Sequence, residues 1–282
     1  MAMYQAKRIG RNSLCVFDPA MKEAVSAHIH LEQDLGQATR SNELELFFQP
    51  QFDFDGHVVS AEALLRWRHP TRGLISPKDF IGIAEESGLI LSIGLWVLKE
   101  ACKQIKIWDA DELMKGIQIA INVSASQFKH QGFVNEVIQT ITESGIDPAR
   151  IKFELTESMM HSIDDTREKM ERIRELGVRF SLDDFGTGYS SLSSLIQLPL
   201  EQLKIDRSFV SNMLSRPGDQ IVVKTIIGMA HSLGLEVIAE GLETEAQKDF
   251  LHLHGCTLYQ GYLLSPALPA DAFFAFVQTQ DQ

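Results

Sequence analysis

The sequence predicts an α/β protein, a TIM-like (β/α)8 barrel whose first strand is antiparallel to the others. Eight short apolar runs alternate, for the most part, with segments of helix length, as they do in such barrels. The 282 residues are close to the roughly 250 that such a barrel requires. The first two runs are joined by a short connection with the hairpin signal Asp55-Gly56, which predicts that these two strands are antiparallel.

The expected strands are short runs of aliphatic and β-branched residues bounded by turn residues. In chain order they cover residues 44–49, 58–64, 117–123, 151–155, 178–183, 202–205, 236–239 and 257–260.

Helical segments are expected between most of these strands because apolar residues recur there with helical spacing. They cover residues 77–108, 126–144, 163–176, 219–233 and 245–253. A further helix over residues 27–38 is expected to lead into the barrel. Residues 1–25 differ in pattern and are interpreted as the end of another unit, so we expect the main domain to cover 26–282.

Composition excludes some partners. Lys and Arg number 26 against 38 Asp and Glu, a net charge of −12, so we expect no duplex nucleic acid as partner. No apolar run reaches the ~18 residues of a membrane span, so we expect no membrane contact by this chain. The three cysteines are far apart and lack a C-x-x-C pair, which is typical of reduced thiols and favours a cytoplasmic location.

Polar residues occupy the carboxyl end of seven consecutive expected strands. They are Glu62, Asn122, Glu154, Asp183 with Asp184, Lys204, Glu240 and Gln260. One such carboxylate is most simply a solvated residue or a helix cap. Because the carboxyl ends of barrel strands meet on one rim, the full series predicts a functional site there.

Clustered carboxylates repel one another unless cations bind among them, so the site is expected to hold metal. Ligands that offer only oxygen favour hard ions, here Mg2+ or Mn2+. Adjacent Asp183 and Asp184 can serve two ions, the arrangement used in phosphoester displacement. Calcium, which is larger and looser in geometry, is expected to bind and to inhibit.

These residues lie in a series of ordered motifs, and through them the chain resembles the EAL domains, phosphodiesterases of the bacterial second messenger cyclic di-GMP. The matching motifs are Gln49-Pro50, Ala61-Glu62-Ala63-Leu64-Leu65-Arg66-Trp67, Asn122-Val123-Ser124, Phe153-Glu154-Leu155-Thr156-Glu157-Ser158, Asp183-Asp184-Phe185-Gly186-Thr187-Gly188, Leu203-Lys204-Ile205-Asp206, Ala239-Glu240-Gly241 and Gln260-Gly261.

The resemblance implies a two-metal hydrolysis of cyclic di-GMP to linear 5′-pGpG. The implied ligands of the two ions are Glu62, Asn122, Glu154, Asp183, Asp184 and Glu240. The implied catalytic residues are Glu62, Lys204, Glu240 and Glu157, the last steadying the loop after Asp184. The implied substrate contacts are Gln49, Leu64, Arg66, Asp206 and Gln260.

Residues 2–7, Gly10-Arg11-Asn12 and Phe17 resemble the last helix and strand of a GGDEF diguanylate cyclase domain. This implies that residues 1–25 are a GGDEF remnant with a linker, and that 26–282 form the EAL domain of a longer parent protein, which can itself be membrane-anchored. The family resemblance also implies a homodimer.

Two other functions are compatible with part of this pattern. The chain could be a receptor that binds cyclic di-GMP without hydrolysing it, although such receptors usually lack some of the metal ligands. It could also be an unrelated metal-dependent barrel enzyme acting on another phosphate ester or an enolate; the Gln49 and Arg66 matches argue against that. For Lys204 alone, an internal salt bridge of the barrel is the structural alternative.

Overall fold

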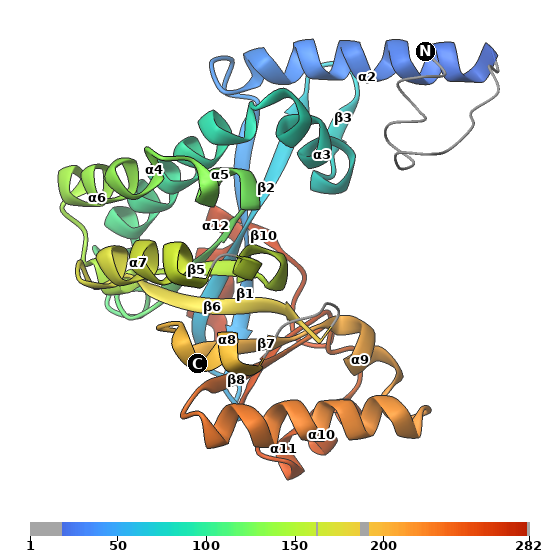
Figure 1. Cartoon of the computed structure of the whole chain (residues 1–282), viewed down its shortest axis with the longest axis vertical. Helices are drawn as coiled ribbons and strands as arrows, with labels where there is room; N and C mark the ends of the chain where they lie inside the picture. The colour runs from blue at the N-terminus through green and yellow to red at the C-terminus, as the bar shows by residue number, and fades with distance from the viewer. Residues whose placement is uncertain (1–18, 162, 187–191, 281–282) are drawn as a thin grey trace. The chain divides into compact units, whose positions relative to one another are not determined.

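The computed structural model describes residues 19–161, 163–186 and 192–280 (Figure 1). The segment that resembles a GGDEF domain and the glycine-containing loop at 187–191 therefore lie outside the described residues, as does Cys15. The described chain forms two compact units. The first holds the residues up to Glu45 together with Arg66–Ile93, and the second holds Leu46–Leu65 and the chain from Gly94 onward.

The first unit is built on helix α2 (Pro19–Ala38), which contacts helix α3 (Pro77–Ser87). The buried ring of His69 binds Asp34 of α2 through Nε2 at 3.2 Å. A short strand, β3 (Gly73–Ile75), pairs in antiparallel fashion with the end of β2. The helix expected over 27–38 is thus confirmed, and it begins earlier than expected.

The second unit contains the closed barrel. The barrel strands are β1 (Leu44–Phe52), β2 (Val58–His69), β4 (Gln118–Val123), β5 (Ile151–Thr156), β6 (Arg179–Phe185), β7 (Gln202–Ile205), β8 (Glu236–Glu240) and β9 (Leu258–Gln260), of which the start of β1 and the end of β2 belong to the first unit. Their order is β1-β9-β8-β7-β6-β5-β4-β2, and a β1–β2 pairing closes the ring. Each of the eight expected strands is confirmed, with ends that differ by a few residues. The short strands β3 and β10 (Leu268–Pro269) were not expected.

The first strand is antiparallel, as predicted. Strand β1 pairs in antiparallel fashion with β9, whereas β2 and β4 to β9 pair in parallel. The connection from β1 to β2 is a tight turn in which Gly56 has a φ of 91° and donates its N–H to the Asp53 carbonyl at 3.3 Å. Glycine adopts this left-handed conformation at little cost, so Asp55-Gly56 reverses the chain here.

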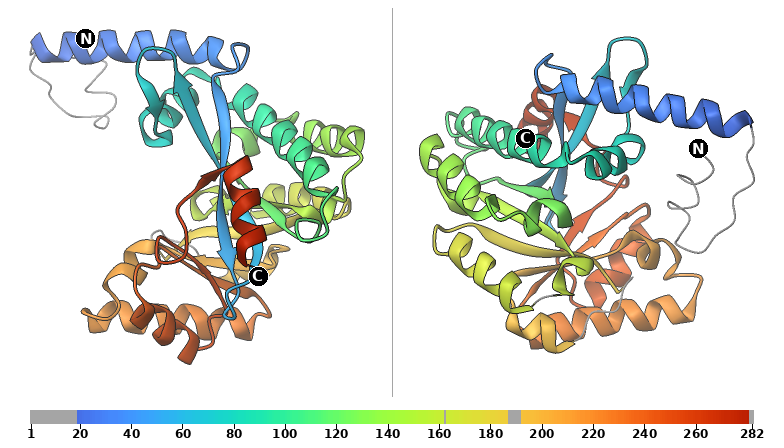
Figure 2. Two further views of the ribbon diagram at one scale, coloured as in Figure 1. Left: turned by 180° about the vertical axis from the view of Figure 1, so that it is seen from behind. Right: turned by 45° about the horizontal axis from the view of Figure 1, so that its top comes forward.

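Helices lie outside the barrel strands (Figures 1 and 2). They are α4 (Ile90–Trp108), α5 (Ala125–Lys129), α6 (Phe133–Ser144), α7 (Ile163–Arg174), α8 (Leu192–Gln197), α9 (Arg207–Asn212), α10 (Pro217–Ser232), α11 (Glu245–Leu253) and α12 (Ala270–Gln280), with 3-10 turns η1 (Pro148–Arg150) and η2 (Glu157–His161). Among the described residues, no helix is long and apolar enough to span a membrane.

Two expected helices are divided in the structure. The segment 77–108 forms α3 and α4, because Gly88 ends α3 in a left-handed conformation with a φ of 77°. The segment 126–144 forms α5 and α6, separated at His130 by extended backbone. Helices α8, α9 and α12 were not expected.

Successive side chains of each strand point to opposite faces, so the residues that pack against the helices are separated from those that face the site. On β5, Phe153 packs outward between Phe133 of α6 and Phe180 of β6, with ring centroids 6.2 and 6.0 Å apart. Its neighbours Lys152 and Glu154 are buried on the opposite, inner face. The outer face therefore holds the helices, and the inner face can carry polar groups to the end of the barrel.

Candidate functional site

Four carboxylates converge on the ammonium group of Lys204 at the carboxyl end of the barrel. Lys204 Nζ lies 2.6 Å from Glu240 Oε1, 3.4 Å from Asp183 Oδ1 and 3.7 Å from Glu62 Oε2, and it also contacts Glu154 Oε2. The five residues come from five different strands: β2, β5, β6, β7 and β8. The structure thus brings together the predicted strand-end residues, and it shows Lys204 in the internal ion pairs that were the alternative for it.

This packing shifts the protonation equilibria. Burial alone lowers the pKa of Lys204, but the surrounding carboxylates raise it well above its usual range, so it stays charged. Burial raises the pKa of Glu154 well above its usual range, although Lys204 opposes the shift. Burial likewise raises the pKa of Glu240 to about 8. Without a further cation, this site therefore holds protons on some of its acids at neutral pH.

Glu62 differs from these acids because two amides bind its carboxylate. Asn122 donates Nδ2–H to Oε1 and Gln260 donates Nε2–H to Oε2, both at 2.6 Å. Burial would raise the pKa of Glu62, but the charge of Lys204 and these hydrogen bonds outweigh it and lower the pKa. The protein therefore favours the ionised form of Glu62.

A break in strand β6 places two acids at the site. The β6–β7 register shifts between Leu182 and Phe185, and Asp184 adopts a φ of 55°, which is uncommon for a residue other than glycine. Asp184 donates its backbone N–H to Asp183 Oδ1 at 2.9 Å. Burial raises the pKa of Asp184 to about 6, with the charges of Asp183 and Asp206 adding to the shift. Strained backbone of this kind is typical of functional sites.

The potential ligand atoms at this site suit a hard divalent cation. Glu154 is 1% exposed, and among the described residues its Oε1 has no hydrogen-bond partner. A buried carboxylate oxygen left without a partner costs free energy unless a ligand binds it. The potential metal ligands around Glu154 are carboxylate oxygens and the amide of Asn122, and Mg2+ and Mn2+ prefer oxygen ligands of this kind.

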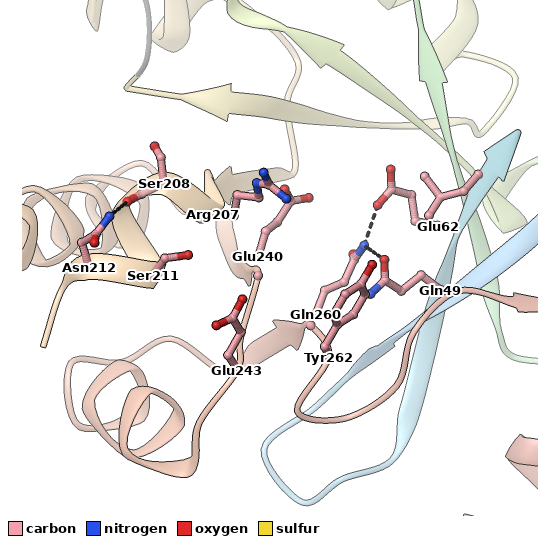
Figure 3. A pocket seen from close by; sticks show the side chains of 13 residues that line it. Gln49, Glu62, Arg207, Ser208, Ser211, Asn212, Glu240, Glu243, Gln260 and Tyr262 are labelled. Atoms are coloured by element: carbon pink, nitrogen blue, oxygen red, sulfur yellow. Dashed lines mark hydrogen bonds between the residues drawn. The ribbon is translucent and has the colours of Figure 1, made fainter. Parts of the chain in front are cut away.

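A pocket of about 480 Å3 opens beside the cluster (Figure 3). Of the predicted site residues it is lined by Gln49, Glu62, Leu64, Glu240 and Gln260. The sequence interpretation missed the other lining residues, which are Arg207, Ser208, Ser211, Asn212, Gly241, Glu243, Gly261 and Tyr262. Most of them follow directly after β7, β8 or β9, so their position just past a strand end was the available signal.

Eight predicted site residues lie outside the lining of this pocket: Asn122, Glu154, Asp183, Asp184 and Lys204, which are described above, and Arg66, Asp206 and Glu157. Arg66 is half-buried on β2, beyond Leu64, in the part of the strand that belongs to the first unit. Asp206 caps helix α9, where its Oδ1 accepts the N–H of Ser208 at 3.0 Å. Glu157 is buried at the start of η2, which contacts β6.

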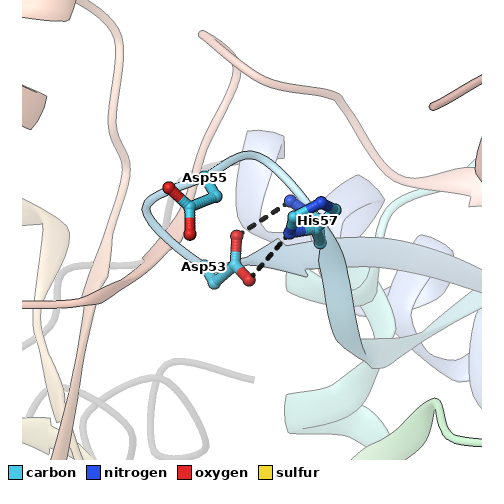
Figure 4. A group of neighbouring side chains, drawn as sticks. All are labelled: Asp53, Asp55 and His57. Atoms are coloured by element: carbon cyan, nitrogen blue, oxygen red, sulfur yellow. Dashed lines mark hydrogen bonds and ion pairs between the residues drawn. The ribbon is translucent and has the colours of Figure 1, made fainter. Parts of the chain in front are cut away.

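A second acidic group lies at the β1–β2 turn (Figure 4). Ligand atoms of Asp53, Asp55 and His57 lie within 4.8 Å of one another. Asp53 is already bound to His57, whose backbone N–H and Nδ1 lie 2.8 and 3.2 Å from its two oxygens. This turn precedes β2, so it lies at the amino end of the parallel strands, opposite the Lys204 cluster. Its hydrogen bonds shape the hairpin.

The fold and this site define a (β/α)8-barrel protein with an acidic, oxygen-rich centre at the carboxyl ends of its strands. The sequence matches the EAL domain family over residues 32–267, and the chain therefore belongs to that family.

Several curated proteins are similar over nearly the whole chain. The bifunctional diguanylate cyclase/cyclic di-GMP phosphodiesterase MucR of Pseudomonas aeruginosa is 42% identical over 278 residues, covering 98% of this chain and 40% of that protein. The cyclic di-GMP phosphodiesterase PdeR of Escherichia coli is 39% identical, covering 96% and 41%. The chain thus spans about two fifths of the length of these relatives.

Solved structures are similar as well. The PaMucR phosphodiesterase in complex with c-di-GMP has a TM-score of 0.83 and 41% identity, covering 86% of this chain and 99% of that one. The EAL enzyme Bd1971 in its cAMP- and cyclic-di-GMP-bound form has a TM-score of 0.82 and 34% identity, covering 98% and 73%.

Proposed function

We propose that this chain is a phosphodiesterase that hydrolyses cyclic di-GMP to linear 5′-pGpG. The observation that carries the proposal is the convergence of four carboxylates on Lys204 beside a pocket large enough for a ligand. Relatives named as cyclic di-GMP phosphodiesterases, and a similar structure in complex with c-di-GMP, support this substrate.

The acidic residues are proposed to hold two divalent ions, Mg2+ or Mn2+. The ligands of the first are Glu62, Asn122, Glu154 and Asp183, and those of the second are Asp183, Asp184 and Glu240. When bound, such ions offset the negative charge, polarise phosphate oxygens and lower the pKa of water. Glu154 Oε1 has no hydrogen-bond partner in the described part of the chain, which supports a ligand at the first position.

The protein groups position the substrate and balance its charge. Hydrolysis joins a water oxygen to phosphorus and breaks the bond to the ribose 3′-oxygen, which leaves with a proton. The buried ammonium of Lys204 supplies fixed positive charge where negative charge develops on the phosphate. Glu62, held ionised by its amide partners, can accept a proton or hold a ligand in one orientation.

Substrate contacts are proposed for Gln49, Leu64, Arg66, Asp206 and Gln260. Gln49, Leu64 and Gln260 line the pocket and can contact the nucleotide directly. Arg66 can bind two phosphate oxygens at once through its guanidinium fork. Asp206 is proposed to contact substrate from the start of α9, and Glu157 to steady the chain after Asp184.

Separation of the nucleotide products tests this function. The full chain is incubated with cyclic di-GMP and Mg2+, Mn2+ or Ca2+, and the products are separated by chromatography. We expect linear pGpG with Mg2+ or Mn2+, little with Ca2+, and none with Asp183→Asn. Tight binding of cyclic di-GMP without a linear product would overturn the proposal and favour a receptor.

The homodimer, the cytoplasmic location and the absence of duplex nucleic acid stay predictions from the sequence. Light scattering coupled to size-exclusion chromatography tests the first of them. A mass of one chain, 31.6 kDa, with and without ligand would contradict it.

A further inference from the structure

A chain of hydrogen bonds runs inside the barrel from Ser60 to Glu62 and crosses three neighbouring strands. Ser60 Oγ–H on β2 donates to Gln51 Oε1 on β1. Gln51 Nε2–H donates to Gln260 Oε1 on β9 at 2.8 Å, and Gln260 Nε2–H donates to Glu62 Oε2 at 2.6 Å. Each of these residues is buried, and Gln51 is 0% exposed.

The chain has one direction because it ends on a carboxylate. Gln260 turns its NH2 group toward Glu62 and toward Gln49 Oε1, which lies 3.3 Å away, and it turns its oxygen toward Gln51. Gln51 must then present its own NH2 group to Gln260, which leaves its oxygen for the Ser60 hydroxyl. Each hydrogen bond of the chain thus restricts the orientation of the amides that it joins.

We propose that Gln51 is a positioning residue for the active site. It fixes the amide of Gln260 and, through it, the carboxylate of Glu62 that is proposed to hold metal. Without Gln51 the buried oxygen of the Gln260 amide loses its donor, so the orientation that gives the NH2 group of Gln260 to Glu62 is held less firmly. The inference rests on the proposed function, since it assigns Gln51 to the same site.

The barrel offers a matched control. Gln202 is also 0% exposed and faces the interior on β7, but within the described chain both polar atoms of its amide lack hydrogen-bond partners. Replacing either glutamine with methionine removes the same group and keeps a similar volume. A difference between the two variants therefore reports the hydrogen-bond chain and not the loss of a buried amide in general.

The test is a Mn2+ titration of the full chain followed by thermal unfolding, with turnover of cyclic di-GMP measured in parallel. For Gln51→Met we expect the Mn2+ concentration that gives half of the maximal stabilisation to rise by about 10-fold, the lower end of the range for losing a partner of a metal ligand, because Gln51 acts on Glu62 through Gln260. For Gln202→Met we expect no change in this concentration. Equal shifts in both variants, or no shift in Gln51→Met, would overturn the proposal.

Ser60 provides a second pair of variants should Gln51→Met fail to fold. Ser60→Ala removes the first donor of the chain and is expected to weaken Mn2+ binding, whereas Ser60→Thr keeps a hydroxyl and is expected to bind Mn2+ like the wild type. Identical Mn2+ binding by these two variants contradicts the proposal. Because the titration does not depend on turnover, it remains decisive even if the wild-type protein proves not to hydrolyse cyclic di-GMP.

Discussion

Lys204 Nζ lies 2.6 Å from Glu240 Oε1, and the same ammonium group also contacts Glu62, Glu154 and Asp183. One positive charge thus faces four acids in a buried site. The protein alone can meet this imbalance only by keeping protons on some of the acids, as the raised pKa values of Glu154 and Glu240 indicate. Bound divalent cations would take the place of those protons, so stability, pH and metal binding should be linked.

Removal of Lys204 should make folding depend on metal. In Lys204→Met the acids lose their buried cation, and the loss of one partner of a buried ion pair costs about 3–5 kcal/mol. We expect a large fall in melting temperature in EDTA and partial recovery with Mn2+. Calorimetry in the two buffers measures both. An unchanged melting temperature in EDTA would mean that Lys204 does not balance the acids.

Metal binding should strengthen as the pH rises toward 8. Glu240 has a pKa of about 8 in the folded protein against an ordinary value of 4.5, so between these pH values the folded state holds a proton that the unfolded state has lost. The free energy of unfolding in EDTA should therefore fall as the pH rises through this window. A metal that must displace this proton binds better at higher pH.

Thermal unfolding at pH 5.5, 7.0 and 8.5, with EDTA or with Mn2+, measures this linkage. We expect the Mn2+-induced rise in melting temperature to be larger at pH 8.5 than at pH 5.5. Glu240→Gln serves as the control, because it removes one of the titrating groups and should reduce the pH dependence in EDTA, while Glu154 and Asp184 still contribute. A Mn2+ effect that is the same at each pH would contradict the assignment.

Glu154→Gln should separate stability from activity. The substitution keeps the shape of a side chain that is 1% exposed and replaces an acid whose charged form burial disfavours. We expect a melting temperature in EDTA equal to or above that of the wild type, with turnover reduced by about 100-fold, the upper range for a disturbed metal site. A variant that is less stable and fully active would show that Glu154 is only structural.

The sequence predicts the barrel well because each strand is a short apolar run and the site residues follow at its end. The tight turn at Asp55-Gly56 even predicts the antiparallel first strand, which the pairing of β1 with β9 confirms. The sequence does not predict that Gly88 divides a helix, since a glycine within a helical pattern can be tolerated or can end it.

Contacts across the barrel are harder to predict than positions along it. The clustered carboxylates predicted a need for cations. The sequence did not predict that Lys204 contacts four of them, because these contacts form between side chains of different strands only once the barrel is closed. The same holds for Gln51, which looks like any polar residue of β1 until Gln260 is placed beside it. Arg207 lines the pocket because α9 begins directly after β7, and this short helix was not expected.

Gly261 should tolerate no side chain. A Cβ built there would overlap the backbone N and O of Leu242, whose N–H donates to the Gln260 carbonyl at 3.1 Å. Because backbone atoms cannot rotate away, Gly261→Ala must displace the segment that carries Gln260, and overpacking of this kind costs about 1–3 kcal/mol. We expect urea denaturation to report this loss, and Mn2+ binding to weaken as Gln260 moves away from Glu62. Gly228→Ala is the matched control: Gly228 is an exposed position of helix α10 where a Cβ would meet no atom within 4 Å, so this variant should gain about 0.5–1 kcal/mol in stability. Equal stability changes in the two variants would show that the close approach of Gly261 to Leu242 does not constrain this part of the site.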